Sequence, residues 1–395
     1  MYIMSFLFGN KNKGELVAIL DIGSSRVGGA LVIISKNKSV KPKILLSIKN
    51  PITEDHNLNL QKFTMAMEKS LRKTLRDIEK AKLGSPTRIV CFLSSPWYTS
   101  QNRTISFSKN VPFILNQKVI DELTAREIKL FEIDHLQKYE NELLKPRIIE
   151  SKITQIMLQG YKVENPIGKK VEQIEMSLFL SMSPGKILES IEKEVFKIFH
   201  LPKIEFASFI FSSYAITRDL FIDKENFLLI DIGGEITDIA IIKNNVLLES
   251  ISFPMGSNFL LRRIAEGLNK SVEESKSLLN MCLDDQLNEV EKEKVSKPLH
   301  TAKQEWLSMF QQSLGSVATD LLIPENIYLI TDKPLTSCFI ETITREEFSQ
   351  YALAEKKFEI TSLNEQILHN FCDFETDVSR DRFIIMETIF TSKKM

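Results

Sequence analysis

The sequence predicts an α/β protein of two similar domains, each a mixed β-sheet flanked by helices, with a further subdomain inserted into the first. Two strand–turn–strand patterns predict this fold, because each carries an Asp-Ile-Gly turn and they lie 210 residues apart, at Asp21 and Asp231. Helical periodicity follows each pattern, and a charged, turn-rich stretch between them is typical of an insertion. Because a repeat constrains the whole fold, it is stronger evidence for the fold class than any single motif.

Composition narrows the class of protein and of partner. A chain of 395 residues fits two to four domains, and 51 basic against 52 acidic residues provide no overall field for nucleic acid. We therefore expect no nucleic-acid partner. The four cysteines and five histidines show no metal-binding spacing, and no apolar stretch is long enough to span a membrane. These features predict a cytoplasmic protein.

The first half of the chain begins with a flexible apolar peptide, residues 1–14, which could dock on a partner. Aliphatic runs then predict a β-hairpin at 16–23 and 27–34, and apolar residues spaced by three and four predict a helix over 60–83. The remaining elements expected before residue 200 are strands at 88–94, 103–107, 148–158 and 171–182, and helices at 116–131 and 183–200.

The second half opens with strands at 227–233, 236–243 and 246–253, which repeat the first hairpin. Ser271 and Glu274 form a capping-box pattern at the start of a helix. The other helices expected here are 258–268, 271–280, 300–320, 345–355 and 362–371, and the expected strands are 326–331 and 383–390.

The turns of the two hairpins have the chemistry of a phosphate site. Backbone N–H groups of Gly23, Ser24 and Ser25 can form a nest for phosphate, and two facing nests can hold a polyphosphate. Asp21 and Asp231 could then hold Mg²⁺ through its waters. For one hairpin alone, an ordinary Asp-Gly turn is the simpler interpretation, but two matching copies favour the site. The sequence contains no P-loop, Rossmann or G-x-S-x-G motif, and we assign no catalytic residue.

The two hairpins resemble those of the actin-like ATPase superfamily (actin, Hsp70, sugar kinases), and within it the FtsA/PilM family. Asp21–Val27 looks like the first phosphate loop and Asp231–Asp238 like the second. Phe253–Ser257 is similar to the segment that leads into subdomain 2B of FtsA. Gly160–Gly168, with its flanking strands and the helix at 116–131, resembles the 1C (SHS2-like) subdomain of that family.

The resemblance implies a set of subdomains and a nucleotide site. The implied subdomains are 1A at 15–112 and 183–224, 1C at 113–182, 2A at 225–257 and 324–395, and 2B at 258–323. The implied cofactors are ATP and Mg²⁺, with Asp21 and Asp231 on the metal. The implied cofactor-binding residues are Asp21, Gly23, Ser24, Ser25, Arg26, Asp231, Gly233, Gly234, Thr237 and Gly256.

Three departures from the family pattern point to weakened nucleotide binding. Glu235 stands where a third glycine is usual, bringing a carboxylate toward the phosphates. The expected ribose-binding Glu and Lys correspond to Lys276 and Leu279, and the loop at Ile330–Pro334 has no glycine to approach a base. We expect a nucleotide-binding or pseudo-ATPase scaffold rather than an efficient enzyme.

The resemblance implies a scaffold that binds other proteins in bacterial cell division, at the cytoplasmic face of the membrane. A PilM-like component of a type IV pilus assembly platform is the alternative, and an active ATPase or kinase of the same fold is the second alternative. A two-domain structural protein whose hairpins bind nothing remains open. The expected partners are division or pilus proteins and further copies of the chain in filaments. Residues 2–8 could provide weak peripheral membrane contact.

Overall fold

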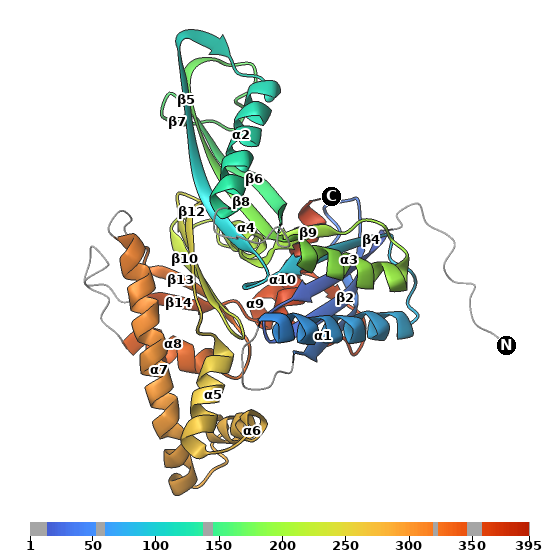
Figure 1. Cartoon of the computed structure of the whole chain (residues 1–395), viewed down its shortest axis with the longest axis vertical. Coiled ribbons are helices and arrows are strands. Elements are labelled where there is room, and N and C mark those ends of the chain that lie inside the picture. Colours follow the sequence, from blue (N-terminus) through green and yellow to red (C-terminus); the bar gives the residue numbers. More distant parts are fainter. Residues whose placement is uncertain (1–13, 53–59, 137–144, 319–322, 346–357, 395) are drawn as a thin grey trace, which may run out of the picture.

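Three β-sheets organise the chain (Figure 1). The computed structural model describes all residues except 1–13, 53–59, 137–144, 319–322, 346–357 and 395. The sequence prediction of duplicated mixed sheets flanked by helices is confirmed. The flexible peptide predicted for residues 1–14 lies outside the described residues except at Gly14, and the membrane contact predicted for residues 2–8 lies wholly outside them.

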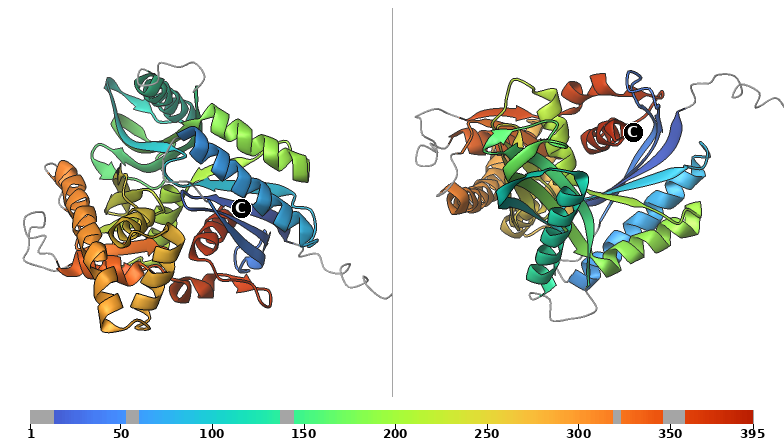
Figure 2. Two further views of the ribbon diagram at one scale, coloured as in Figure 1. Left: turned by 60° about the horizontal axis from the view of Figure 1, so that its bottom comes forward. Right: turned by 90° about the horizontal axis from the view of Figure 1, so that it is seen from above.

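The first domain contains a six-stranded sheet whose strands follow the order β15-β3-β2-β1-β4-β9. Its strands are β1 (Glu15–Ile22), β2 (Arg26–Ile34), β3 (Lys43–Pro51), β4 (Arg88–Leu93), β9 (Glu205–Ser208) and β15 (Asp373–Phe374). Helices α1 (Leu60–Lys80) and α3 (Gly185–Phe199) cover one face, and α4 (Phe209–Leu220) and α10 (Arg382–Lys393) cover the other (Figure 2). Burial between two helical layers explains why β1 and β4 are continuous apolar runs.

The second domain repeats this arrangement in a five-stranded sheet of order β12-β11-β10-β13-β14. Its strands are β10 (Phe227–Ile232), β11 (Thr237–Lys243), β12 (Val246–Phe253), β13 (Asn326–Thr331) and β14 (Glu359–Ser362). In both sheets the Asp-Ile-Gly strand has an antiparallel neighbour after its turn and a parallel neighbour on its other side. The two hairpins are therefore structural repeats as well as sequence repeats.

Helices of the second domain pack on the sheet face that points away from the first domain. They are α5 (Ser257–Leu268), α6 (Val272–Leu283), α7 (Glu289–Ala318) and α8 (Thr336–Arg345). The predicted capping box of Ser271 and Glu274 is present at the start of α6. Along β10, Leu228 and Ile230 pack against these helices, whereas Phe227 and Leu229 join the core of the first domain. This alternation along β10 joins the two domains through one shared hydrophobic core.

The inserted subdomain stands apart as a four-stranded sheet with one helix across it (Figure 1). The sheet has the order β5-β8-β6-β7 and a small core of its own. Its elements are β5 (Thr99–Ile114), α2 (Gln117–Leu136), β6 (Pro146–Leu158), β7 (Tyr161–Lys162) and β8 (Lys170–Pro184). The long strands β5 and β8 run from the first domain into the insertion, so the insertion is continuous with the domain that carries it.

Several element predictions are wrong. The segment 383–390 forms helix α10 instead of a strand, because a helix buried on every side carries no amphipathic pattern, and Asp381 caps its N-terminus. The helix expected at 362–371 is only α9 (Glu365–Leu368) and a short 3₁₀ turn at His369–Phe371. The structure describes α8 before the helix expected at 345–355, most of which lies outside the described residues. Strands β3 and β9 and helix α4 are additional to the elements that the sequence predicts.

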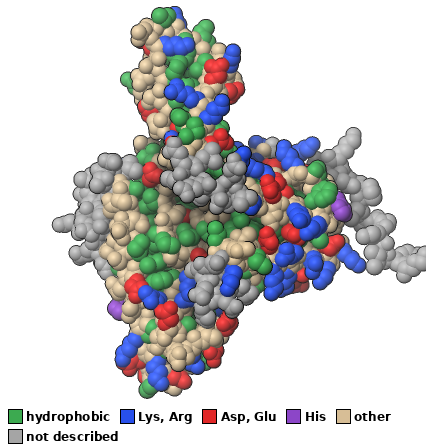
Figure 3. All heavy atoms as spheres, in the orientation of Figure 1, with side chains coloured by type: hydrophobic (Ala, Val, Ile, Leu, Met, Phe, Trp, Pro, Cys, Tyr) green, Lys and Arg blue, Asp and Glu red, His purple; other side chains and the backbone are tan. Residues whose placement is uncertain are grey.

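No described helix is both long and apolar enough to cross a bilayer. Acidic and basic side chains alternate over the face of the first domain shown in Figure 3. That mixture accords with the net charge of −1.

Candidate functional site

The turns that end β1 and β10 have the same local geometry. Gly23 N donates to Arg26 O over 3.0 Å, and Gly233 N donates to Ile236 O over 3.0 Å. These bonds close each turn and use two of the amides that could otherwise hold phosphate. The N–H of Gly23, predicted to point toward a phosphate, is therefore occupied within its own turn.

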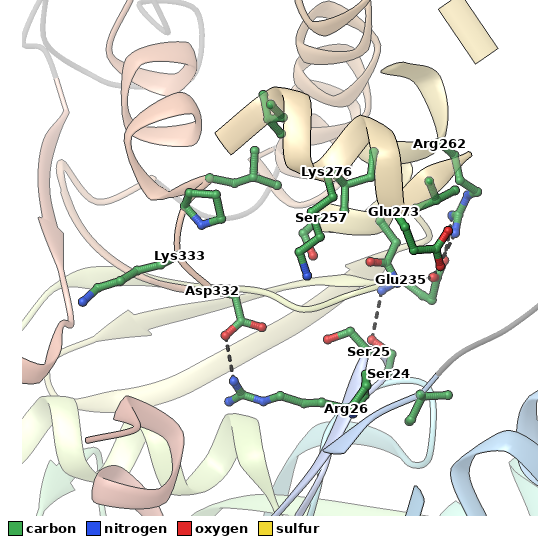
Figure 4. Close-up of a pocket in the computed structure, with 18 of the residues that line it drawn as sticks. Ser24, Ser25, Arg26, Glu235, Ser257, Arg262, Glu273, Lys276, Asp332 and Lys333 are labelled. Atoms are coloured by element: carbon green, nitrogen blue, oxygen red, sulfur yellow. Dashed lines mark hydrogen bonds and ion pairs between the residues drawn. The ribbon is translucent and has the colours of Figure 1, made fainter. Parts of the chain in front are cut away.

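The two turns face each other across the domain junction and are in contact (Figure 4). Glu235 N donates to Ser24 Oγ over 2.9 Å. A Cβ placed on Gly234 would lie 2.5 Å from Ser25 Cβ and 2.8 Å from Ser25 N, which is closer than a carbon can approach. A phosphoryl group is larger than a methyl group, so none can lie between Gly234 and Ser25 in this conformation.

Gly256 holds the second turn against α5. A Cβ there would lie 2.4 Å from the carbonyl oxygens of both Gly233 and Gly234. The absence of a side chain lets Ser257 N and Asn258 N donate to those two oxygens, over 2.9 and 2.8 Å. Gly256 therefore lets the backbone at the start of α5 pack directly against the second turn.

A cavity of about 630 Å³ opens beside the paired turns. This volume is typical of a small-molecule site. Three predicted residues line the cavity: Ser24, Ser25 and Arg26. The other charged or amide side chains that line it are Lys49, Glu235, Asn258, Arg262, Glu273, Lys276, Asn280, Asp332 and Lys333. Figure 4 labels six of them, namely Glu235, Arg262, Glu273, Lys276, Asp332 and Lys333.

Glu235 does not place an unpaired charge in this cavity, contrary to the sequence-based expectation. Arg262 Nη1 and Nη2 donate to its two carboxylate oxygens over 2.9 and 2.7 Å. Asn258 Nδ2 adds a bond of 2.7 Å. Sequence reasoning missed Asn258 and Arg262, although their spacing of four residues on α5 places both on one helix face.

A Glu–Lys pair is also present on α6, in a different register from the one expected. Glu273 and Lys276, three residues apart, both line the cavity. Leu279 is fully buried at its wall. The cavity therefore has both a carboxylate and an ammonium group from α6, at Glu273 and Lys276, whereas the assignment of the ribose-binding positions to Lys276 and Leu279 stays a prediction.

Arg26 links the two domains at the edge of the cavity. Its guanidinium donates to Asp332 Oδ1 over 2.7 Å in the second domain, and to Asp381 Oδ1 over 3.2 Å and Asp21 Oδ2 over 3.5 Å in the first. It also lies 4.2 Å from the centre of the Phe383 ring. Burial acts to lower the pKa of Arg26, but Asp381, Asp332 and Asp21 outweigh it and raise that pKa. Arg26 is therefore a fixed cation in the crevice.

The two predicted metal-binding carboxylates lie deep in the junction instead of at the cavity wall. Asp21 is 2% exposed and Asp231 is 3% exposed. Burial raises the pKa of Asp21 to about 7, against the lowering effect of Arg26. Burial, then Asp238 and Asp21, raise the pKa of Asp231 well above its usual range. Mg²⁺ held through water needs hydrated, ionised carboxylates, so the two aspartates do not fit that role in this conformation.

The described residues include no group of three or more His, Cys, Asp or Glu side chains that could hold a metal ion. Thr237 is also removed from the cavity. Its hydroxyl donates to Met255 O over 2.7 Å and accepts from Trp306 Nε1 over 3.1 Å. The structure therefore brings Ser24, Ser25 and Arg26 to the cavity. The other predicted site residues lie behind it, namely Asp21, Gly23, Asp231, Gly233, Gly234, Thr237 and Gly256.

Comparison with known proteins identifies the fold. No protein-family model matches the sequence, and no curated protein matches it. A solved PilM–PilN type IV pilus biogenesis complex contains a chain that is 13% identical, with a TM-score of 0.63 over 95% of this chain and 98% of that one. The ethanolamine utilization protein EutJ from Carboxydothermus hydrogenoformans is 8% identical, with a TM-score of 0.45 over 97% of this chain and 91% of that one. The chain has the actin-like ATPase fold, which the sequence predicts.

Proposed function

We propose that this protein is a PilM-like scaffold of a type IV pilus assembly platform, acting at the cytoplasmic face of the membrane. The observation that carries the proposal is the match to PilM, which spans 95% of this chain and 98% of that one. This match supports the pilus role, the alternative in the sequence analysis, better than the cell-division role. Since that PilM was solved together with PilN, we propose a PilN-like partner for this chain.

The inserted subdomain is the first place to seek that partner. It projects from the two domains and carries exposed apolar side chains at Val111, Ile114 and Ile153. We propose that it corresponds to the 1C (SHS2-like) subdomain of the FtsA/PilM family, with bounds at Thr99 and Pro184 in place of 113–182. The 2A part expected at 324–395 then ends before β15, because β15 and α10 pack in the first domain. Self-association into filaments and lipid contact through residues 2–8 stay predictions.

The partner proposal is tested with overlapping segments that together cover each PilN-like protein of the same organism. Each segment is immobilised as a synthetic peptide, and binding of the full chain is measured by biolayer interferometry. Saturable binding to one segment and none to its scrambled version is the expected result. The absence of binding to every such segment contradicts the pilus role.

The contact between the two turns supports a scaffold over an efficient ATPase. In this conformation Gly234 and Ser25 leave no space for phosphate between them, and the guanidinium of Arg26 lies beside Asp21. We propose that the 630 Å³ cavity accepts the nucleoside part of ATP beside Glu273 and Lys276, while the phosphates need the domains to separate. No hydrolytic step follows from the geometry.

A thermal-shift titration tests the nucleotide proposal. Adenosine and ATP with Mg²⁺ are compared on the same protein. A ligand at 100 times its dissociation constant stabilises the folded state by about 2.7 kcal/mol, which is readily detected. We expect adenosine and ATP to stabilise about equally. Strong stabilisation by ATP alone would show that the phosphate loops open freely, and no shift with either ligand would show that the cavity is not a nucleoside site.

A further inference from the structure

A second cavity lies between the domains and shares no lining residue with the first. Its volume is about 340 Å³. The turn between β4 and β5 forms one wall, and β11 and β12 form the opposite wall. Its lining residues are Ser95, Pro96, Tyr98, Thr99, Ser100, Ile210, Ile236, Asp238, Ser250 and Ser252.

Asp238 is the one acidic side chain in this wall, and only part of its carboxylate is engaged. The residue is 7% exposed. Oδ1 accepts from Ser95 Oγ over 2.8 Å and also from Ser252 Oγ. Oδ2 receives no hydrogen bond from the residues that the structure describes. Because Asp238 lines the cavity, Oδ2 is the carboxylate oxygen left for a ligand there.

No positive charge compensates Asp238 within the described part of the chain. The cavity wall contains neither lysine nor arginine. Asp238 is instead paired across the strands with Asp231, which is a second acid. Burial raises the pKa of Asp238 to about 6, against the lowering effect of Ser252 and Ser95. At neutral pH the carboxylate is ionised in a site that lacks a counter-ion.

The remaining wall is suited to an organic cation. Hydroxyl oxygens of Thr99, Ser100 and Ser250 can accept hydrogen bonds, and Ser100 Oγ and Ser250 Oγ meet across the domain junction at 3.3 Å. Pro96, Ile210 and Ile236 provide apolar surface. The volume exceeds what a bare metal ion needs, and it accommodates a short alkyl chain.

We propose that this cavity binds the ammonium group of a primary amine, with Asp238 Oδ2 as its counter-charge. An ammonium group offers three donors from one atom, which suits a single free carboxylate oxygen surrounded by hydroxyl acceptors. A guanidinium binds carboxylates best through both oxygens, and Oδ1 already accepts two hydroxyl hydrogen bonds. The amine is either a free alkylamine or the side chain of a lysine from a partner protein, and both present the same chemistry.

The test measures binding of butylammonium to the full chain by isothermal titration calorimetry at pH 8. Butanol serves as the uncharged probe of similar shape. A peptide with a single lysine, compared with its norleucine version, represents a partner side chain. We expect saturable binding of butylammonium, or of the lysine peptide but not of its norleucine version. Whichever of the two amines binds more tightly shows whether the natural ligand is a free alkylamine or the lysine of a partner protein.

Variants of the chain test whether the amine binds in this cavity. Asp238→Asn keeps the shape of the side chain and should weaken amine binding at least tenfold. Glu249→Gln, which removes a carboxylate of β12 outside the cavity wall, is the matched control and should bind like the wild type. Ser250→Leu fills the cavity while retaining Asp238, so it should also abolish binding and provides a second variant should Asp238→Asn fold poorly. Equal binding by wild type and Asp238→Asn, or no binding of either amine probe, overturns the proposal.

Discussion

The buried carboxylate of Asp21 makes an unusual prediction about how stability depends on pH. Its ordinary pKa of 3.8 is raised to about 7 in the folded protein, chiefly by burial. Between these two values the folded state binds more protons than the unfolded state. Stability should therefore fall as the pH rises from about 4 through about 7, the opposite of the usual behaviour of a paired carboxylate.

The size of the effect follows from the same two pKa values. Integrating the proton linkage of this one group between pH 5 and pH 8 gives a loss of about 2–3 kcal/mol of unfolding free energy. Asp238, whose pKa is raised to about 6, adds about 1 kcal/mol in the same direction. Asp231 and Glu387 also have raised pKa values, so they do not oppose this trend.

Urea unfolding at several pH values measures the effect. Trp97 and Trp306 lie in the cores of the first and second domains, so tryptophan fluorescence reports on both. Asp21→Asn should remove about 2–3 kcal/mol of the pH dependence, whereas Asp121→Asn, which removes an exposed carboxylate of α2, should leave it unchanged. The reasoning is refuted if the wild type becomes less stable on acidification from pH 8 to pH 5, or if Asp21→Asn keeps the full slope.

Three further predictions concern the domain junction. Gly234→Ala should destabilise the folded protein by about 1–3 kcal/mol in urea unfolding, because its Cβ would meet Ser25, and unchanged stability would contradict the contact between the turns. Arg26→Met should lower the free energy of unfolding by about 3–5 kcal/mol, because it leaves Asp332 and Asp381 without their shared cation. A decrease below about 1 kcal/mol in the same assay would contradict a stabilising role for these ion pairs. Arg262→Met should weaken binding of adenine nucleotides in calorimetry, because it leaves the Glu235 carboxylate at the cavity without its cation, and unchanged affinity would contradict that role of Arg262.

The sequence predicts the duplicated hairpins well because each depends on local signals. An aliphatic run, an Asp-Ile-Gly turn and a second aliphatic run specify β1–β2 and β10–β11 without reference to the rest of the chain. The capping box at Ser271 is equally local. By contrast, α10 is buried on all sides, so its sequence lacks the polar face that distinguishes a helix from a strand.

The charge relationships of the site could not be predicted because they join residues far apart in the chain. Arg26 pairs with Asp332 and Asp381, which are separated from it by 306 and 355 positions. Whether Glu235 repels a ligand depends on Arg262, which reaches it only once α5 is placed beside the second turn. The role of a glycine also cannot be read from its position in the sequence alone. Gly234 and Gly256 suggest phosphate binding in sequence, but in the structure they permit contact between backbones.

Divergence between the two copies of the repeat explains why the second cavity occurs in only one of them. At equivalent positions of the two sheets, Asp21 faces Gly28 and Asp231 faces Asp238. In the first copy, a Cβ on Gly28 would lie 3.1 Å from Asp21 Cβ and 3.5 Å from Ile384 Cδ1, so α10 closes the space above the strands. In the second copy the equivalent residue is Asp238, whose carboxylate lines a cavity with several hydroxyl groups in its wall. An acid at position 28 would be buried against Asp21 with no space for a counter-ion, so Gly28→Asp should prevent folding. Asp238→Gly should still fold, although it loses amine binding and the hydrogen bonds from Ser95 and Ser252. If both variants fold equally well, the asymmetry between the two copies does not arise from the packing of α10.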